Sequence, residues 1–303
     1  MNSDILKTGN CPDKIASCKL ERTRVSEADN ILGLPFVTLD KGFVRLIDYM
    51  GTDSSIVQAA RVSYGKGTKT ASSDRALIAY LMRKNHTSPF EQVELKFHIK
   101  VPMYIGEQIL RHRTANVNKI SARYSEMEEE FYLPDAARLG KQSTKNKQST
   151  DLENTLNSDE ASNMLDLMLK SFSYSYNYYH SLLEKGLSRE IARGVLSHAL
   201  YTEMYWKIDL RNLFHFLKLR LAPPAQLEIQ KVAEVIGELT RIVAPIAYSH
   251  FEEYIKRPTM IRETDRIDVL VQEMQKRYAL AHSSGDEEES AICKDILIML
   301  KAA

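Results

Sequence analysis

Cysteine is scarce in this chain of 303 residues, and the three cysteines, Cys11, Cys18 and Cys293, form no Cys-x-x-Cys pair. An odd and widely spaced set favours neither a disulfide framework nor a thiolate zinc site. The first ten residues, MNSDILKTGN, lack the apolar core of a signal peptide, and no run approaches the roughly 18 apolar residues of a membrane span. We therefore expect a cytoplasmic protein with no membrane partner.

An excess of charge of one sign is also absent. The 41 Lys and Arg residues are balanced by 40 Asp and Glu residues, which leaves a formal net charge of +1. No global field then draws the protein to nucleic acid or to an anionic membrane, so any attraction for anions is local. The hydrophobic content of 44% is that of an ordinary globular protein.

Several well-known catalytic motifs are missing as well. The chain contains no G-x-x-x-x-G-K-[ST], no G-x-G-x-x-G, no H-E-x-x-H and no G-x-S-x-G. Its eight histidines are scattered rather than clustered at metal-ligand spacing. The sequence therefore predicts no metal site and gives little support to a serine hydrolase.

Hydrophobic periodicity predicts a mixture of strands and helices. Residues 93–100 alternate strictly between apolar and polar side chains, which is the clearest strand signal in the chain. A hairpin is predicted for 36–50 and a further strand for 202–210. The predicted helices cover residues 54–64, 73–85, 102–113, 163–186, 188–196, 211–221 and 225–243.

Three segments differ from this pattern. Residues 1–30 are polar with little periodicity and are predicted to be an N-terminal tail. Residues 140–163 hold few apolar positions, so we expect a mobile loop or lid without regular structure. Residues 263–303 are predicted to form a C-terminal helical extension, which leaves 31–262 as a single catalytic domain.

The helix at 163–186 carries an apolar and aromatic stripe. Its members recur every three or four residues and are Leu165, Met168, Phe172, Tyr176, Tyr179 and Leu183. Such tyrosines suit a stacking platform for a ligand, but the helical spacing alone already explains them. We therefore interpret the stripe as a core face.

Basic residues are concentrated in two stretches that contain no acid. The first lies between Glu107 and Glu126, and the second lies between Asp209 and Glu228. Charge runs are usually solvated helix faces, but the spacing argues against that here, because residues i and i+2 such as Arg111 and Arg113 point in different directions on a helix. Arginine forks interleaved with Asn and Ser are typical of a phosphate cradle. Two such clusters indicate more than one bound phosphate.

The first basic stretch carries a recognisable signature. RHRTANVNKISARY at 111–124 resembles the RHRxxSxNxxSxRY signature of the flavin-dependent thymidylate synthases, with Asn116 in place of the first serine. HTSPFE at 86–91 resembles the H-x-[ST]-P-F-E segment of that family. Further segments that resemble the family's sequence lie at 192–193, 201–220 and 225–228, in the family's order and spacing.

The resemblance implies an α+β fold with a mixed or antiparallel sheet and packed helices. It also implies a methyltransferase that makes dTMP from dUMP, takes the carbon from 5,10-methylenetetrahydrofolate and uses NADPH to reduce a bound FAD. The family's homotetramers build each site from several subunits.

The resemblance also assigns residues to ligands. The dUMP contacts would be Gln108, Ile109, Leu110, Arg111, Lys119, Ile120, Ser121, Ala122, Arg123, Arg193 and Arg220. Arg220 would be the catalytic residue. It would contact the edge of the uracil ring and favour loss of the N3 proton. The FAD contacts would be His86, Ser88, Glu91, Arg111, His112, Arg113, Asn118, Lys119, Asp209, Leu210, Arg211 and His215.

Some positions depart from the family pattern. Lys119 stands where many members carry an acid, Asp209 and His215 stand where asparagine is common, and Pro224 replaces a frequent histidine. The alternative function is a nucleic-acid-binding helical protein that uses the same basic clusters. Such a protein is expected to be basic overall, with aromatic residues among its cations, and only Tyr124 and Phe216 serve here.

Overall fold

The computed structural model describes residues 22–62, 74–144 and 147–256, together with the single residues 275, 278 and 294. At its centre is a five-stranded antiparallel sheet with the strand order β1-β2-β3-β7-β4. The strands are β1 (Phe36–Thr38), β2 (Gly42–Met50), β3 (Glu94–Pro102), β4 (Asn116–Lys119) and β7 (Tyr201–Asp209). The predicted α+β class, the hairpin at 36–50 and the strands at 93–100 and 202–210 are confirmed.

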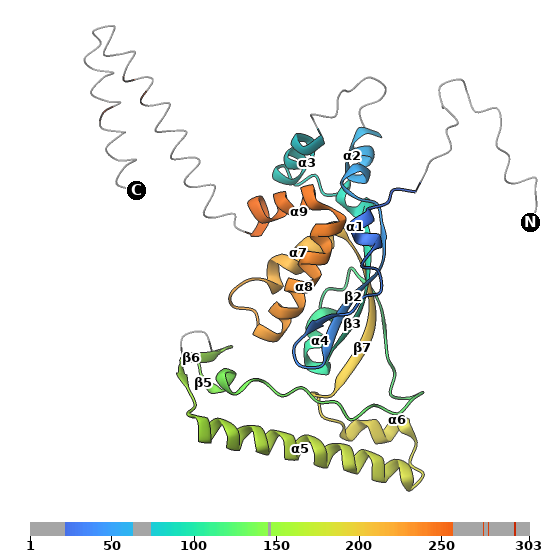
Figure 1. The fold of residues 1–303 in the computed structure, drawn as a ribbon, viewed down its shortest axis with the longest axis vertical. Helices are drawn as coiled ribbons and strands as arrows, with labels where there is room; N and C mark the ends of the chain where they lie inside the picture. The colour runs from blue at the N-terminus through green and yellow to red at the C-terminus, as the bar shows by residue number, and fades with distance from the viewer. Residues whose placement is uncertain are drawn as a thin grey trace, which may run out of the picture.

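One face of the sheet forms the core because the alternation of β3 places all its large apolar side chains there. Leu95, Phe97 and Ile99 are completely buried, as are Leu46 of β2 and Trp206 of β7. The helices α4 (Met103–Leu110), α7 (Leu210–Arg220) and α8 (Leu227–Val243) pack against the sheet (Figure 1). This packing fixes the ends of α4 and α7, which carry several of the predicted site residues.

Helices α2 (Asp53–Arg61), α3 (Asp74–Arg83) and α9 (Pro245–Phe251) lie together at one end of the molecule. The Asp53 carboxylate accepts hydrogen bonds from the backbone N–H groups of Ile246 and Ala247, each at 2.8 Å. Because these N–H groups have no partner inside their own helix, Asp53 caps the start of α9 and joins it to α2.

The described N-terminal residues differ from the predicted tail. Residues Ser26–Asp29 form the short helix α1, and Ala28 is completely buried against the core. One small buried side chain in a single helical turn leaves no periodic pattern, which explains why the sequence did not indicate it. The predicted C-terminal extension, 263–303, lies outside the described residues apart from the three single positions named above.

The expectation that residues 140–163 lack regular structure is wrong. Strands β5 (Gly140–Gln142) and β6 (Thr150–Thr155) pair as a separate two-stranded ribbon. Helix α5 (Ser158–Glu184) begins five residues before the predicted start, because Asn157 and Glu160 form a capping box with hydrogen bonds of 2.9 and 3.2 Å. The hydrogen bonds that pair β5 with β6, and those that cap α5, need few apolar residues. Composition alone therefore did not reveal these elements.

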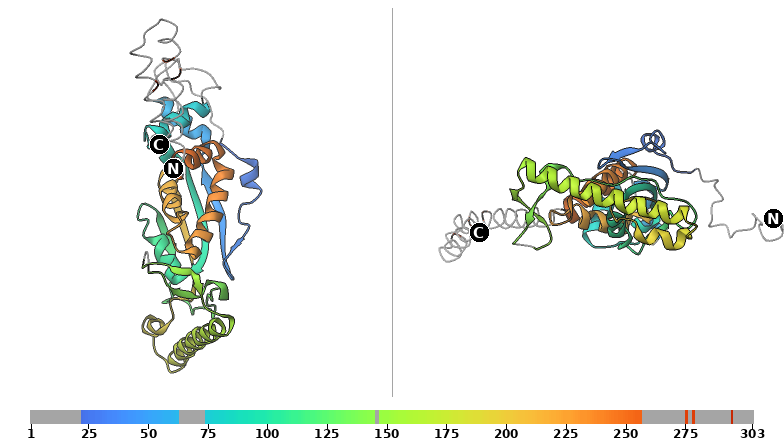
Figure 2. Two further views of the ribbon diagram at one scale, coloured as in Figure 1. Left: turned by 90° about the vertical axis from the view of Figure 1, so that its left-hand side faces the viewer. Right: turned by 90° about the horizontal axis from the view of Figure 1, so that it is seen from below.

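Helix α5 and the short helix α6 (Arg189–Ala192) lie at the far end of the molecule from α2 and α3 (Figures 1 and 2). The predicted stripe faces inward: Tyr179 is completely buried, and Phe172 and Tyr176 pack on a small cluster with Met127 and Phe131. The core interpretation is thus confirmed for Tyr179, whereas the other five members of the stripe are half-buried. No helix in the described part of the chain has the length and apolarity to cross a membrane.

Candidate active site

The predicted site residues fall into three groups within one chain. The first group lies where α4 and α7 end, the second where α7 begins, and the third beyond the edge strand β4. Arg211 and Arg220 are nine residues apart on α7, which corresponds to about 13 Å along the helix axis. The first two groups therefore occupy opposite ends of one helix.

Arg220 is the centre of the first group. Its Nε donates to His112 Nε2 at 3.2 Å, and its Nη2 donates to the backbone carbonyl of Gln108 at 3.1 Å. The side chain of Gln108 in turn donates to Gln226 Oε1 at 2.7 Å. Arg220 is half-buried, and burial lowers its pKa from the ordinary arginine value. The structure thus joins three of the predicted residues directly.

His112 lies inside this group rather than on the surface. Helix α4 ends at Leu110, not at Arg113 as predicted, so the Arg-His-Arg run follows the helix as a turn. That turn leaves Arg111 and Arg113 exposed and buries His112, whose ring meets Phe216 edge-on with centroids 4.9 Å apart. Burial, with smaller contributions from Arg220 and His215, lowers the pKa of His112 to about 4. The ring is therefore neutral at physiological pH.

The second group surrounds the start of α7. Asp209 caps the helix, because its carboxylate accepts from the backbone N–H of Asn212 at 2.9 Å and from the Asn212 side chain at 2.6 Å. Arg211 pairs with Glu91, which lies on the one-turn helix η3 (Phe90–Gln92), at 3.8 Å. His86 and Ser88 line a neighbouring cavity of about 650 Å³. The structure thus gathers five of the residues predicted to contact FAD.

The third group follows the sheet edge. Strand β4 pairs with β7 and carries Asn118 and Lys119, and burial lowers the pKa of Lys119 despite the nearby Glu107. Beyond the strand, the Ser121 hydroxyl accepts from the backbone N–H of Arg123 at 3.3 Å. Arg123 pairs with Glu190 of α6 at 3.6 Å. The third group therefore reaches toward the end of the molecule that holds α5 and α6.

Arg193 begins the one-turn helix η5 (Arg193–Val195), and its side chain is exposed like those of Arg111 and Arg113. Across the described residues, no ion pair is formed by any of these three arginines. Uncompensated guanidinium groups of this kind suit ligands that carry phosphate. Arg111 and Arg113 follow α4, whereas Arg193 follows α6.

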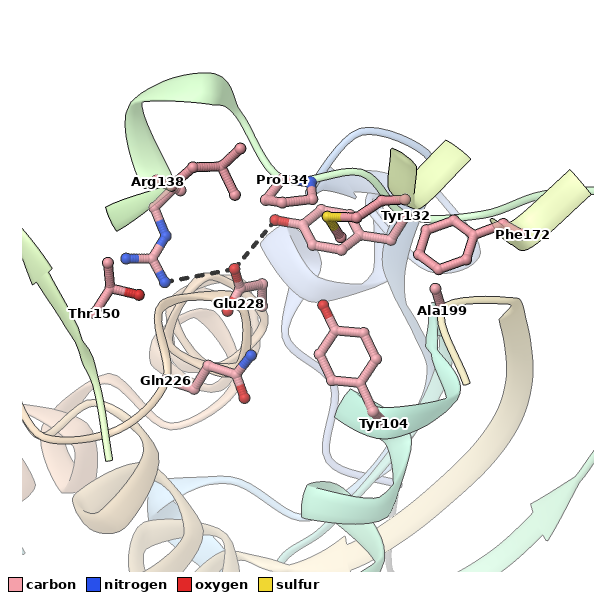
Figure 3. A pocket seen from close by; sticks show the side chains of 11 residues that line it. Tyr104, Tyr132, Pro134, Arg138, Thr150, Phe172, Ala199, Gln226 and Glu228 are labelled. Carbon is pink, nitrogen blue, oxygen red and sulfur yellow. Dashed lines mark hydrogen bonds and ion pairs between the residues drawn. The ribbon is translucent and has the colours of Figure 1, made fainter. Parts of the chain in front are cut away.

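Sequence reasoning missed a cavity of about 290 Å³ between α4, α5 and the start of α8 (Figure 3). Its polar centre is Glu228, which is 4% exposed. One Glu228 oxygen accepts from the Tyr132 hydroxyl at 3.2 Å and lies 3.5 Å from Arg138. Burial and the Glu228 charge raise the pKa of Tyr132 and Tyr104. None of the predicted site residues lines this cavity, but Met168 and Phe172 of the predicted stripe and Gln226 and Glu228 of the 225–228 segment do.

Metal ligation is not supported in the ranges that the structure describes, because no three His, Cys, Asp or Glu side chains come close enough to hold an ion.

Comparison with known proteins places this geometry in context. The family model described as "Thymidylate synthase complementing protein" matches residues 45–246. A flavin-dependent thymidylate synthase of Thermus thermophilus is 54% identical over 232 residues, 77% of this chain and 83% of the relative. Its counterpart in Wolbachia pipientis is 49% identical over 244 residues, 80% of this chain and 85% of the relative. The crystal structure of a UMP/dUMP methylase from Streptomyces cacaoi bound with 5-Br dUMP superposes with a TM-score of 0.66 at 32% identity, covering 73% of this chain and 99% of that one.

Proposed function

The chain belongs to the family of flavin-dependent thymidylate synthases, and from this premise we propose that it makes dTMP from dUMP, with methylenetetrahydrofolate as carbon donor and NADPH reducing a bound FAD. The observation that carries the proposal is the 54% identity over 232 residues, and the family model matches residues 45–246, which include all three groups of predicted site residues. The alternative, a nucleic-acid-binding helical protein, is not supported by these relatives.

The residues present fit a dinucleotide cofactor. Three exposed arginines, Arg111, Arg113 and Arg193, have no acidic partner among the described residues, and a cavity of about 650 Å³ opens beside His86 and Ser88. The forks of Arg111 and Arg113 would hold the FAD pyrophosphate, because a planar guanidinium binds phosphate oxygens in pairs. FAD, when bound, supplies the hydride that reduces the pyrimidine.

The dUMP contacts are proposed for the first and third groups. Arg123 and Arg193 would bind the phosphate, Gln108 would orient the nucleotide, and Ser121, already held by the Arg123 backbone, would position the substrate. Arg220 would donate to the uracil edge and stabilise the negative charge that develops when the N3 proton leaves. His86, Glu91 and Arg211 are assigned to FAD, and the Asp209 carboxylate serves mainly as the cap of α7.

We also propose a homotetramer whose sites are shared between subunits. The support within one protomer is that the first two groups lie at opposite ends of α7, while Arg123 of the third group pairs with Glu190 of α6. In addition, α5 exposes Leu167, Tyr174 and Tyr178 to 60%, 65% and 66% on the face opposite its packed stripe. Contact with a second copy would both complete the site and cover this apolar face.

The test is a direct one. Purified protein supplemented with FAD and desalted should show an oxidised-flavin spectrum that NADPH bleaches without oxygen, and addition of dUMP and methylenetetrahydrofolate should restore it with formation of dTMP. Arg113→Ala is the matched variant, expected to lose flavin because it removes an exposed fork. Protein that stays colourless and makes no dTMP would refute the proposal.

A further inference from the structure

We propose that His112 is a positioning residue for Arg220. Its Nε2 accepts a hydrogen bond from Arg220 and thereby fixes the orientation of the guanidinium group that contacts uracil in the proposed reaction. This role rests on the proposed function, because it concerns the same site. It differs from the assignment of His112 to FAD that the resemblance implies, since here the imidazole acts on another side chain of the same chain.

The two contacts of Arg220 use one edge of its guanidinium group. Nε donates to His112 and Nη2 donates to the Gln108 carbonyl, and both donors lie along the side edge of the fork. An arginine has five N–H donors, so three remain, all on Nη1 and Nη2 at the end of the group. The side edge is anchored to the protein while the end edge stays available to a substrate carbonyl or an imide anion.

The chemistry of the pair allows only one direction of donation. Arginine has no acceptor, so His112 Nε2 must be unprotonated and the ring proton must sit on Nδ1. Burial keeps the ring in that neutral state, with a pKa of about 4. The charged or titratable groups that face it are Arg220 and His215, both from α7, while α4 presents the uncharged Gln108. A second positive charge here would repel the guanidinium.

The ring itself has little freedom to move. His112 is 8% exposed and meets the completely buried Phe216 edge-on at 4.9 Å, and Phe216 packs on the completely buried Trp206 at 5.0 Å. Its backbone N–H donates to the Ile109 carbonyl at 3.0 Å, which holds the turn after α4. The Nε2 acceptor is therefore placed by the core, and a rigid acceptor is what positions a long arginine side chain.

Two substitutions of His112 distinguish the role of its hydrogen-bond acceptor from the role of its ring. His112→Gln keeps a polar group near the position of Nε2, whereas His112→Phe keeps a ring against Phe216 and removes the acceptor. At saturating dUMP, we expect His112→Phe to lower the single-turnover rate of dTMP formation by about 10- to 100-fold, the range for losing a hydrogen bond to a charged group. His112→Gln should stay within about 3-fold of wild type, because the acceptor that orients Arg220 is retained.

Three further readouts distinguish positioning from a structural or cofactor role. The N3 pKa of bound 5-bromo-dUMP, followed by its absorbance, should rise in His112→Phe and not in His112→Gln. Flavin content and the thermal midpoint should match wild type in both. Crystal structures should show the Arg220 fork turned away in His112→Phe only.

Several results would overturn the proposal. Full activity and an unmoved guanidinium in His112→Phe would remove His112 from the positioning of Arg220. Equal losses of flavin in both variants would show that His112 serves the cofactor instead, and equal losses of thermal stability would show a packing role. If wild-type protein makes no dTMP, the proposed function fails, while the orientation of Arg220 in the two variant crystal structures still decides this inference.

Discussion

Two regions of this molecule use similar helices in different ways. In the body, formed by the five-stranded sheet with α7 and α8, the apolar stripe of α8 is buried throughout: Ile229, Val232 and Ile236 are completely inaccessible. In the arm, formed by β5, β6, α5 and α6, the longer helix α5 buries only Ala161 and Tyr179. Helical periodicity therefore predicts the helix in both regions, but it does not predict how much of the helix the chain covers.

The predicted site residues also differ between the body and the arm in how firmly they are held. In the body, Arg220 is held by two hydrogen bonds of 3.1 and 3.2 Å to partners that the core positions. Toward the arm, Arg123 is matched by Glu190 at 3.6 Å, and both side chains are about half exposed. Surface pairs of this kind contribute little to stability. The proposed catalytic Arg220 is thus held by the body, whereas Arg123, proposed to bind the dUMP phosphate, is paired with the arm.

Shortening a buried side chain in the body should lower the free energy of unfolding the most. Phe97→Ala removes a completely buried ring that lies 6.1 Å from the Trp206 ring, and we expect it to lower the free energy of unfolding by about 3–5 kcal/mol. Chemical denaturation measures the change. Val37→Ala on the edge strand, at a side chain 72% exposed, is the matched control and should stay within about 0.5 kcal/mol. A loss below about 1 kcal/mol for Phe97→Ala would show that the body is not the rigid region.

Substitution of the Arg138–Glu228 ion pair, which lies between the arm and the body, should lower the free energy of unfolding by a smaller amount. Arg138→Met removes the cation 3.5 Å from Glu228, a carboxylate 5% exposed that lies at the start of α8 (Figure 3). Because Arg138 itself is 22% exposed, we expect a cost of about 1.5–3 kcal/mol, together with faster proteolysis between 139 and 157. Arg138→Lys keeps the charge and should lose less. If the two variants unfold at the wild-type denaturant concentration, this ion pair does not join the arm to the body.

The arm helix should show the smallest effect on the protomer. Leu167→Ala truncates a side chain 60% exposed, so the free energy of unfolding should change by no more than about 0.5 kcal/mol. If the exposed face of α5 contacts another copy, the same change should weaken the tetramer, measured by light scattering across a dilution series. Lys170→Ala, with its side chain 61% exposed on the same helix, is the control. An unchanged tetramer on dilution would place the subunit contact elsewhere.

Sequence reasoning succeeded where one short-range signal was enough. The alternation of 93–100 identified β3 and its buried face, and helical periodicity predicted a helix at 225–243, where α8 lies. It failed where backbone hydrogen bonds replaced apolar anchors, as in β5, β6 and the capping box at Asn157. It also missed α1, whose single buried residue, Ala28, gives no period to detect.

The sequence by itself indicated the mixture of strands and helices, the two basic stretches and, through the motifs at 86–91 and 111–124, the resemblance to the family and its α+β fold. Only the tertiary structure decided that His112 turns inward while Arg111 and Arg113 stay exposed, because α4 ends at Leu110 and the chain then turns. The pairing of His112 with Arg220 joins residues 108 positions apart, and no local pattern records such a contact. Periodicity reports which side of an element is apolar, whereas the packing of elements against one another decides which polar side chains meet.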